Sequence, residues 1–182
     1  MAEVAIRKPA LSGLLAGSAT VRLTVAPVAS RLSLRAPAES VSALSSALGV
    51  TLPTAPKTSG SAGGRSAFWL GPDEWLVIDE AGSDLLSLLS GADALHSAVD
   101  VSHRNVGITV SGPGAEVTLS AGCPQDLSLE TFPVGACSRT IFGKAEIVLF
   151  RTEEDTFRVE CWRSFSDYVF GLLAEGAEDA SH

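Results

Sequence analysis

Apolar and polar residues alternate most regularly in the middle of the chain, over residues 106–111. Three branched apolar residues there are separated by small or polar ones, the period of two that predicts a half-buried strand. The Ser-Gly-Pro-Gly run at 111–114 ends the strand, and its serine and first glycine can cap a helix whose first turn holds the proline. Ala115 and Leu119 give this helix an apolar side, and Gly122 ends it. The pattern predicts a strand, a tight turn and a short helix.

The N-terminal half begins with similar signals. Residues 21–25 and 31–35 alternate like strands, with Leu32 and Leu34 pointing inward. Residues 39–48 carry apolar side chains at helical spacing, and a glycine follows them. Residues 54–66 contain mostly Gly, Ser, Ala, Thr and Pro, which predicts a flexible loop.

Two hairpins and two further helices complete the expected elements. The turn sequence Gly-Pro-Asp-Glu at 71–74 divides the apolar runs of a hairpin over residues 67–79. A helix over 83–90 is expected to be capped by Ser83 and to bury Leu85, Leu86, Leu88 and Leu89. In the second half we expect a loop at 125–136, a strand at 137–142, a hairpin over 145–161 and a helix from Ser164 to about residue 174.

These elements occur in the same order in both halves, at an offset of roughly 75–82 residues, which is typical of a duplicated unit rather than a solenoid repeat. We therefore predict an α+β fold made from a duplicated β-α-β-β-α unit, with one antiparallel or mixed sheet and helices packed on one side of it. The expected organisation is an N-terminal arm at 1–18, a single domain at 19–175 and a C-terminal tail at 176–182.

Composition narrows the class of protein. The chain has 182 residues and a formal net charge of -8, which disfavours nucleic acid and anionic membranes as partners. The sequence contains no run of about 18 apolar residues, so no transmembrane helix is predicted. The three cysteines form no C-x-x-C pair, which is typical of reduced thiols in the cytoplasm. The N-terminus has only a short, interrupted apolar stretch, so export is not expected.

The sequence contains fragments that resemble catalytic or ligand-binding motifs, but none of them is complete. Asp100, Ser102 and His103 resemble parts of a hydrolase site, but on an extended strand His103 points away from the other two, and a turn that satisfies backbone groups is expected instead. No histidine has another metal ligand at a suitable spacing, so no metal site is predicted. The glycine-rich stretches lack the residues of a dinucleotide fingerprint or a P-loop.

Aromatic and basic residues are more informative. All three tryptophans lie in or beside predicted hairpin strands, where they can be core residues or buried anchors of an interface. An arginine follows an aromatic residue in the pair Trp162-Arg163, and another follows a histidine in the pair His103-Arg104. The interface candidates are therefore Trp69, Trp75, His103, Arg104, Trp162 and Arg163. Glu146 opens a predicted strand and is either a ligand-facing acid or a solvated strand end.

Five motifs, in order, resemble the gamma subunits of heterotetrameric sarcosine oxidases over residues 19–174. They are Phe68-Trp-Leu-Gly-Pro-Asp-Glu-Trp-Leu, Asp100-Val-Ser-His-Arg, Gly122-Cys-Pro-Gln-Asp-Leu, Phe132-Pro-Val-Gly and Trp162-Arg-Ser-Phe. A more distant resemblance, through Asp100-Val-Ser-His, Ser111-Gly-Pro, Asp126-Leu and Phe157-Arg-Val, is to the folate-binding domain of glycine-cleavage aminomethyltransferases. The duplicated α+β fold of that domain agrees with the internal repeat.

The first resemblance implies an interaction subunit without a catalytic residue, cofactor or metal of its own. It implies alpha and beta partner subunits that hold FAD, FMN and NAD, and a delta subunit that holds zinc. Such a complex oxidatively demethylates sarcosine to glycine and passes the one-carbon unit to tetrahydrofolate. The alternative is a free-standing folate-binding or one-carbon-transfer protein. In the aminomethyltransferases an adjacent acid pair precedes the strand equivalent to residues 147–151, whereas Ala145 and Glu146 stand here. Glu146 is therefore the one candidate acid on the folate side.

Overall fold

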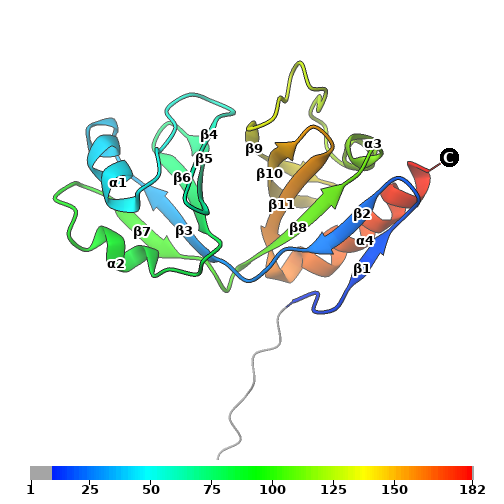
Figure 1. Cartoon of the computed structure of the whole chain (residues 1–182), viewed down its shortest axis with the longest axis horizontal. Coiled ribbons are helices and arrows are strands. Elements are labelled where there is room, and N and C mark those ends of the chain that lie inside the picture. The colour runs from blue at the N-terminus through cyan, green and yellow to red at the C-terminus, as the bar shows by residue number, and fades with distance from the viewer. Residues whose placement is uncertain (1–9, 182) are drawn as a thin grey trace, which may run out of the picture.

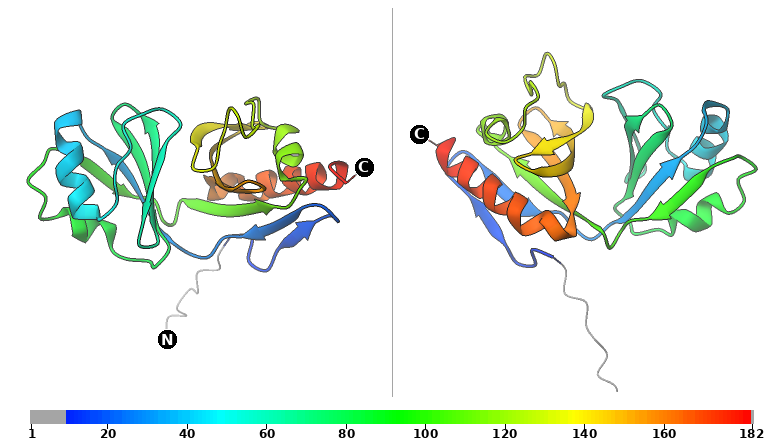
Figure 2. Two further views of the ribbon diagram at one scale, coloured as in Figure 1. Left: turned by 45° about the horizontal axis from the view of Figure 1, so that its top comes forward. Right: turned by 180° about the vertical axis from the view of Figure 1, so that it is seen from behind.

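The computed structural model describes residues 10–181 as an α+β fold with two antiparallel sheets (Figure 1). The inner faces of the sheets meet each other, and two helices cover the outer face of each sheet. The layers are therefore helices, sheet, sheet and helices. Figure 2 shows the longest helix lying across the back of one sheet.

The first sheet has the strand order β4-β5-β6-β3-β7. The turn between β5 and β6 is the predicted Pro72-Asp73 pair. Gly49 ends α1 in the left-handed conformation, at φ 65°, which a glycine adopts without steric cost. The bounds are β3 (Ser30–Arg35), α1 (Val41–Leu48), β4 (Ser59–Ala62), β5 (Arg65–Gly71), β6 (Glu74–Asp79), α2 (Leu85–Leu89) and β7 (Ser97–Asp100), with a 3-10 turn, η1 (Ala38–Ser40), before α1.

The second sheet has the strand order β1-β2-β8-β11-β10-β9. It contains the predicted hairpin, with β10 paired to β11, and the predicted central strand, β8, paired to β11. The bounds are β1 (Leu15–Gly17), β2 (Arg22–Val25), β8 (Asn105–Ser111), α3 (Ala115–Ser120), β9 (Cys137–Phe142), β10 (Ala145–Glu153), β11 (Thr156–Trp162), η2 (Arg163–Phe165) and α4 (Ser166–Asp179).

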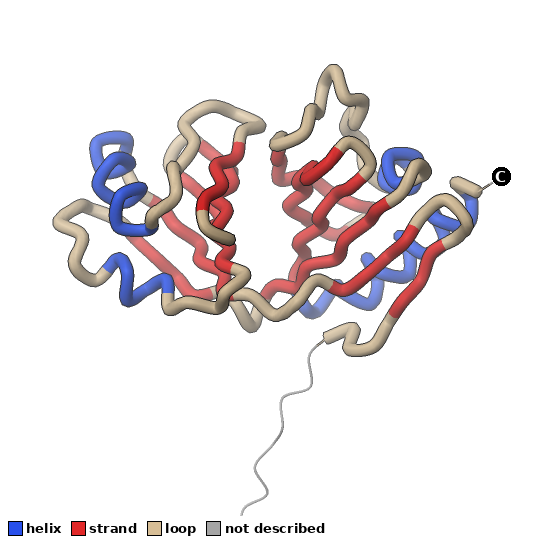
Figure 3. The backbone as a smooth tube through the Cα atoms, viewed as in Figure 1, coloured by secondary structure: helices blue, strands red, loops and turns tan. Residues whose placement is uncertain are grey.

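The two halves exchange their leading strands. In chain order, β2-β3-α1-β4-β5-β6-α2 corresponds to β7-β8-α3-β9-β10-β11-α4. Yet β2 pairs with β8 of the second half, and β7 pairs with β3 of the first. The connections 26–29 and 101–104 pass each other at the junction of the sheets (Figures 1 and 3). The first sheet therefore contains β7 from the second half of the chain, and the second sheet contains β2, with its hairpin partner β1, from the first half.

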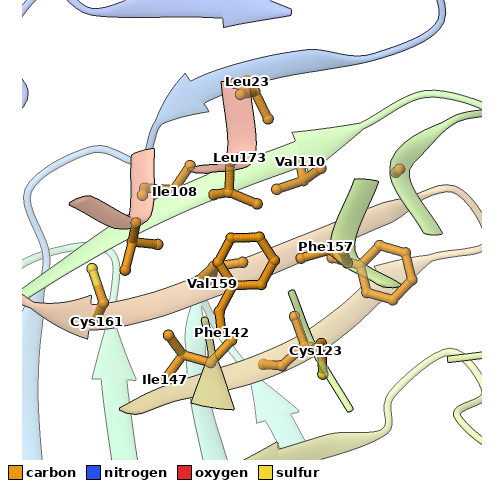
Figure 4. Close-up of a cluster of buried hydrophobic side chains, with 14 of the residues drawn as sticks. Leu23, Ile108, Val110, Cys123, Phe142, Ile147, Phe157, Val159, Cys161 and Leu173 are labelled. Atoms are coloured by element: carbon orange, nitrogen blue, oxygen red, sulfur yellow. The ribbon is translucent and has the colours of Figure 1, made fainter. Parts of the chain in front are cut away.

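Three apolar clusters stabilise these layers. The largest fills the space between the second sheet, α3 and α4, and includes Leu23, Val159 and Leu173 (Figure 4). A second lies between the first sheet and its helices. The third joins the inner faces of the two sheets around Phe68 of β5 and Phe150 of β10, whose ring centroids are 4.7 Å apart. Burial of apolar area on both faces of each sheet holds the two halves as one unit.

A buried ion-pair chain crosses the same inner space. Arg31 of β3 donates to Glu160 of β11, which also accepts a hydrogen bond of 2.8 Å from Nε of Arg158. Arg158 donates from Nη1 to Glu80, at 2.9 Å. Gly107 leaves room for this chain, because a Cβ atom there would lie 2.7 Å from Oε1 of Glu160. This series of ion pairs thus joins strands of both halves, and each buried charge in it lies next to an opposite charge.

The α+β class is confirmed, as are the predicted strands at 31–35, 106–111 and 137–142. The prediction of one sheet was wrong, because the inner apolar positions of each half face the other sheet rather than continuing its hydrogen-bond ladder. The loop predicted at 54–66 contains β4, whose small polar residues pair at the edge of the first sheet.

Three local expectations also need correction. Asp84, not Ser83, caps α2, by accepting from the backbone N–H of Ser87 at 3.1 Å. Of the four leucines assigned to its buried side, Leu86 and Leu88 are exposed, because α2 presents only a narrow face to the sheet. The domain limits are different too: β1 lies within the predicted arm, and α4 continues through residues 176–179 of the predicted tail. The remainder of the arm, residues 1–9, lies outside the described residues.

Candidate functional site

Four of the seven candidate residues line one small cavity at an end of the space between the sheets. They are Trp75, Arg104, Glu146 and Trp162, which come from β6, the connection 101–104, β10 and β11. The cavity has a volume of about 170 Å³. Its walls are apolar side chains of both sheets together with two glutamates and two arginines, which are Glu74, Glu146, Arg104 and Arg139. The strand exchange brings Arg104, from the second crossing connection, to this position.

Trp162 and Arg104 are exposed members of this site that contact each other. The guanidinium carbon of Arg104 lies 4.0 Å from the centroid of the Trp162 ring, a cation–π geometry. A backbone hydrogen bond of 2.6 Å from the N–H of Arg163 to the carbonyl of Arg104 ties the two segments together. The Trp162 and Phe165 side chains remain 39% and 42% exposed, with ring centroids 6.1 Å apart. This is an aromatic and cationic surface held in a fixed arrangement.

The strand register explains why these residues share a face. Ile141 of β9 is opposite Glu146 of β10, and Trp162 of β11 is opposite Asn105 of β8. Because Ile147 is opposite Cys161, the same register places Glu146 beside Trp162. The four side chains form a row across the inner face of the second sheet. Ile141 and Phe165 are exposed members of this region that the sequence analysis missed, although the alternation of the hairpin predicts that Glu146 and Trp162 share a face.

An ion pair between the sheets lies beside this row. Both terminal nitrogens of Arg139 donate to Glu74 at 2.9 Å, one to each carboxylate oxygen. This bidentate hydrogen bonding raises the pKa of Arg139 above its ordinary value, against the smaller effect of burial. The pair joins β9 to β6 and fixes one wall of the cavity.

The remaining candidates have different environments. Trp75 is only 1% exposed and donates from its ring N–H to the carbonyl of Pro53 at 2.7 Å. It is therefore a core residue, although it also contributes to the lining of the cavity. Its role at an interface with another subunit stays a prediction. Trp69 is half-buried and lies opposite Trp75 on the neighbouring strand.

His103 and Arg163 line a second cavity, of about 210 Å³, beside the crossing connections. Its other polar lining side chains are Ser102, Asn105 and Arg31, and the rest is mostly apolar. Both His103 and Arg163 are exposed. Residues of the connection 101–104 thus line both hollows.

The residues that resembled a hydrolase site form a turn. The carboxylate of Asp100 accepts from the backbone N–H of Ser102 at 2.8 Å, and the pKa of Asp100 is lowered by its hydrogen bonds with Ser102. The hydroxyl oxygen of Ser102 accepts from the backbone N–H of Arg31 at 2.9 Å. These polar groups therefore hold the crossing connections together, as expected for a structural turn.

The three cysteines are buried free thiols. Burial raises the pKa of the Cys137 thiol to about 11 and that of Cys161 to about 12. Cys137 donates to the carbonyl of Thr58 at 3.0 Å, next to the point where β9 meets the first sheet. Residues 10–181 contain no group of three or more His, Cys, Asp or Glu side chains arranged to hold a metal ion. No helix in that same part of the chain is long and apolar enough to span a bilayer.

The similarity of this chain to known proteins extends over most of its length. The profile of the "Sarcosine oxidase, gamma subunit family" matches residues 34–180. Among curated proteins, sarcosine oxidase subunit gamma of Corynebacterium sp. strain U-96 is 31% identical over 92% of this chain and 84% of its own length. The corresponding subunit of Arthrobacter sp. is 34% identical over 64% of this chain and 59% of its own length.

Solved structures give a consistent result. A chain of the heterotetrameric sarcosine oxidase from Corynebacterium sp. U-96, in complex with pyrrole 2-carboxylate, matches with a TM-score of 0.84 at 30% identity. The match covers 89% of this chain and 86% of that one. Glycine cleavage system aminomethyltransferase T from Bartonella henselae matches with a TM-score of 0.63 at 13% identity, over 85% of this chain and 45% of that one, which is a likeness of fold.

Proposed function

This chain belongs to the sarcosine oxidase gamma subunit family, and we propose that it acts as the non-catalytic gamma subunit of a heterotetrameric sarcosine oxidase. The observation that carries the proposal is the similarity to the Corynebacterium enzyme, in sequence and in fold, over more than four fifths of both chains. A match of this extent includes strands of both sheets, and not only one motif.

The partners in this proposal are alpha, beta and delta subunits. FAD, FMN, NAD and tetrahydrofolate belong to alpha and beta, and zinc belongs to delta. Those groups supply the oxidation of the secondary amine and the transfer of its one-carbon unit. The part played by this chain is to fold into a rigid two-sheet body and to present a surface to which the other subunits attach.

The roles of its reactive side chains support a non-catalytic subunit. Asp100 and Ser102 are occupied by hydrogen bonds that shape a turn. The thiols of Cys137 and Cys161 are buried, and their raised pKa keeps them protonated at neutral pH. Arg31 and Glu160 neutralise each other inside the fold. In each case the functional group that a reaction would need is already engaged in a contact that maintains the fold.

The folate alternative rests on Glu146, and its surroundings do not favour it. The carboxylate is exposed on β10, beside a cavity of about 170 Å³. Pockets that bind drug-sized ligands have volumes of about 300–1,000 Å³. A pterin with its aminobenzoyl-glutamate arm belongs to that class and does not fit this cavity, so the free-standing one-carbon protein is the weaker proposal.

We place this assembly in the cytoplasm. The support is that all three thiols are core residues on separate elements, packed by apolar neighbours, as is usual for reduced proteins.

Co-expression tests the proposed function. The chain is produced together with alpha, beta and delta subunits from the same genome, and the complex is purified through a tag on this chain. We expect one species on sizing that contains all four subunits and has a flavin absorption spectrum. The matched control is the same set of subunits without this chain, which should give less assembled flavoprotein. Recovery of the tagged chain alone, with full assembly of the others in its absence, would refute the proposal.

A further inference from the structure

A cavity of about 340 Å³ lies between the two sheets, next to the contact of Phe68 with Phe150. Its lining comes mostly from β4, β5 and β6 of the first sheet and from β10 and β11 of the second, and it is called here the Arg158 cavity. In Figure 1 the β4–β5 and β10–β11 hairpins stand on either side of the space between the sheets. We propose that the Arg158 cavity binds a free amino acid with a large apolar side chain, whose carboxylate pairs with Arg158 and whose ammonium pairs with Glu80. This proposal goes beyond the proposed function and does not depend on it.

The size and the apolar lining of the cavity suit a small organic molecule. Its volume lies within the range of about 300–1,000 Å³ that is usual for such pockets. Phe68, Ile78 and Phe150 form the apolar part of the lining, from both sheets. The turn at Gly63 and Gly64 lines another part, and a Cβ atom at either glycine would meet nothing within 4 Å, so this side is open. An apolar group that enters there exchanges water contact for contact with the three large side chains.

The guanidinium of Arg158 offers donors to a carboxylate. Its Nε atom donates to Glu160 inside the fold, at 2.8 Å, and its Nη1 atom donates to Glu80, at 2.9 Å. The Nη2 atom is buried and has no hydrogen-bond partner among the described residues. A carboxylate that replaces Glu80 on Nη1 would accept from both terminal nitrogens, in the bidentate geometry that arginine favours. The ligand would thereby satisfy a donor that the fold leaves without a partner.

Glu80 is suited to exchange one partner for another. Its side chain is 64% exposed, whereas that of Arg158 is 11% exposed. An ion pair with one partner in solvent contributes little to stability, so its separation costs little. The carboxylate of Glu80 remains beside the cavity after it leaves Arg158, where the ammonium group of the ligand can take its place as the counter-charge. One ion pair of the protein thus becomes two ion pairs with the ligand.

The balance of charge around the cavity favours a zwitterion over an anion or a cation. The charged side chains that line it, with those that they contact, include equal numbers of arginines and carboxylates. Arg65 is paired with Asp79, and the other four form one connected group. A ligand with a net charge would leave one charge of this group without compensation, and a zwitterion would not. The six residues are Arg31, Arg65, Arg158, Asp79, Glu80 and Glu160.

Titration of the purified full-length chain, followed by ligand-observed NMR, tests the proposal with four compounds. L-phenylalanine should bind about tenfold or more tightly than hydrocinnamate, which lacks the ammonium group, because each charged hydrogen bond contributes to affinity. It should exceed phenethylamine, which lacks the carboxylate, by a similar factor. Glycine should also bind more weakly, because it leaves the apolar lining uncovered. Equal binding of the three phenyl compounds, or saturable binding by none of them, would overturn the proposal.

A substitution at the exposed partner locates the binding. Glu80→Gln should weaken L-phenylalanine binding about tenfold and leave hydrocinnamate binding unchanged or stronger, because Arg158 then has no competing carboxylate. Glu154→Gln, at the exposed turn between β10 and β11, is the matched control and should change neither affinity. Denaturant midpoints of both variants verify the fold. An unchanged affinity of the Glu80 variant for L-phenylalanine would place the ligand elsewhere and refute the proposal. None of these outcomes bears on the proposed function, since subunit assembly is not measured.

Discussion

Arg31 and Glu160 are joined by two hydrogen bonds across the interface of the two sheets, from Nε at 2.7 Å and from Nη2 at 3.1 Å. The two side chains are 4% and 2% exposed. They lie 129 positions apart in the sequence, on strands that belong to different sheets. This relationship is a buried polar link between the halves, and it makes the fold sensitive to substitution at either residue.

Arg31→Ala should lower the free energy of unfolding by about 3–5 kcal/mol, because it leaves the buried carboxylate of Glu160 with less compensation. Denaturation in guanidinium chloride, followed by tryptophan fluorescence, measures the change. Arg35→Ala on the same strand is the matched control, since its pair with Asp73 is more than half exposed and should contribute less than about 1 kcal/mol. Equal losses for the two variants would show that the inner pair has no special role.

Gly107→Ala should destabilise the protein by about 1–3 kcal/mol, as expected for overpacking. The added Cβ would lie 2.7 Å from Oε1 of Glu160 and 2.9 Å from the Cβ of Ala26, on opposite sides of β8. Gly171→Ala in α4 is the matched control, because a Cβ there meets nothing within 4 Å and a helix gains about 0.5–1 kcal/mol from the exchange. Denaturation in guanidinium chloride measures both changes, and a Gly107 variant as stable as the wild type would contradict the close packing.

The thiols of Cys137 and Cys161 should react slowly with iodoacetamide in the native protein at pH 8. With pKa values raised to about 11 and about 12, mainly by burial, about one molecule in a thousand or fewer carries the reactive thiolate. Mass spectrometry of peptides after labelling, with and without denaturant, gives the ratio of rates. Fast native labelling at either residue would show that these positions open to solvent.

The same two thiols make stability depend on alkaline pH. Their pKa is higher in the folded than in the unfolded chain, so the unfolded chain loses protons first, above its ordinary value of about 9. Stability should therefore be fully present below pH 9 and decline as the pH rises toward 11–12. Denaturant midpoints from pH 8 to pH 11 should decrease less in Cys161→Ala than in the wild type.

Asp79 should contribute to stability that is lost in acid. Burial alone would raise its pKa, but hydrogen bonds from Arg65, Ser83 and Ala81 hold that pKa below its ordinary value of 3.8. Its contribution is thus present above pH 3.8 and lost as the pH falls through the folded-state pKa. Asp79→Asn should be less stable at neutral pH and show a flatter acid transition in circular dichroism. Asp155→Asn, at an exposed turn, controls for the loss of one charge.

Periodicity predicted the elements better than their partners. The strand at 106–111 and the hairpin at 145–161 follow from alternation that each strand carries within itself. By contrast, β4 and β7 are short edge strands whose residues, Ser-Gly-Ser-Ala and Ser-Ala-Val-Asp, have no strong propensity, and their pairing with longer neighbours defines them. The exchange of β2 and β7 has no signal in either strand, since register and partner depend on the whole fold.

The surface residues show the same limit. Trp75 and Trp162 both end or begin hairpin strands, but one is core and the other exposed, because only Trp75 faces a helix layer. Arg104 and Trp162 were separate candidates, and the crossing of the connections brings them to 4.0 Å. Ile141 and Phe165 were not distinguished from core residues, since exposure of an apolar side chain depends on what packs over it.

The exchanged strands have a consequence for biosynthesis. As the polypeptide leaves the ribosome, β2 is made first, but the strand with which it pairs, β8, is completed only at residue 111. The nascent first sheet lacks β7 until residue 100 has been made, so an open edge persists through the first half of translation. An early translation stop between the halves would release a product with unpaired strand edges, which is prone to aggregation or degradation. Separately expressed halves should be soluble only when they are mixed, because each then receives its missing strand from the other.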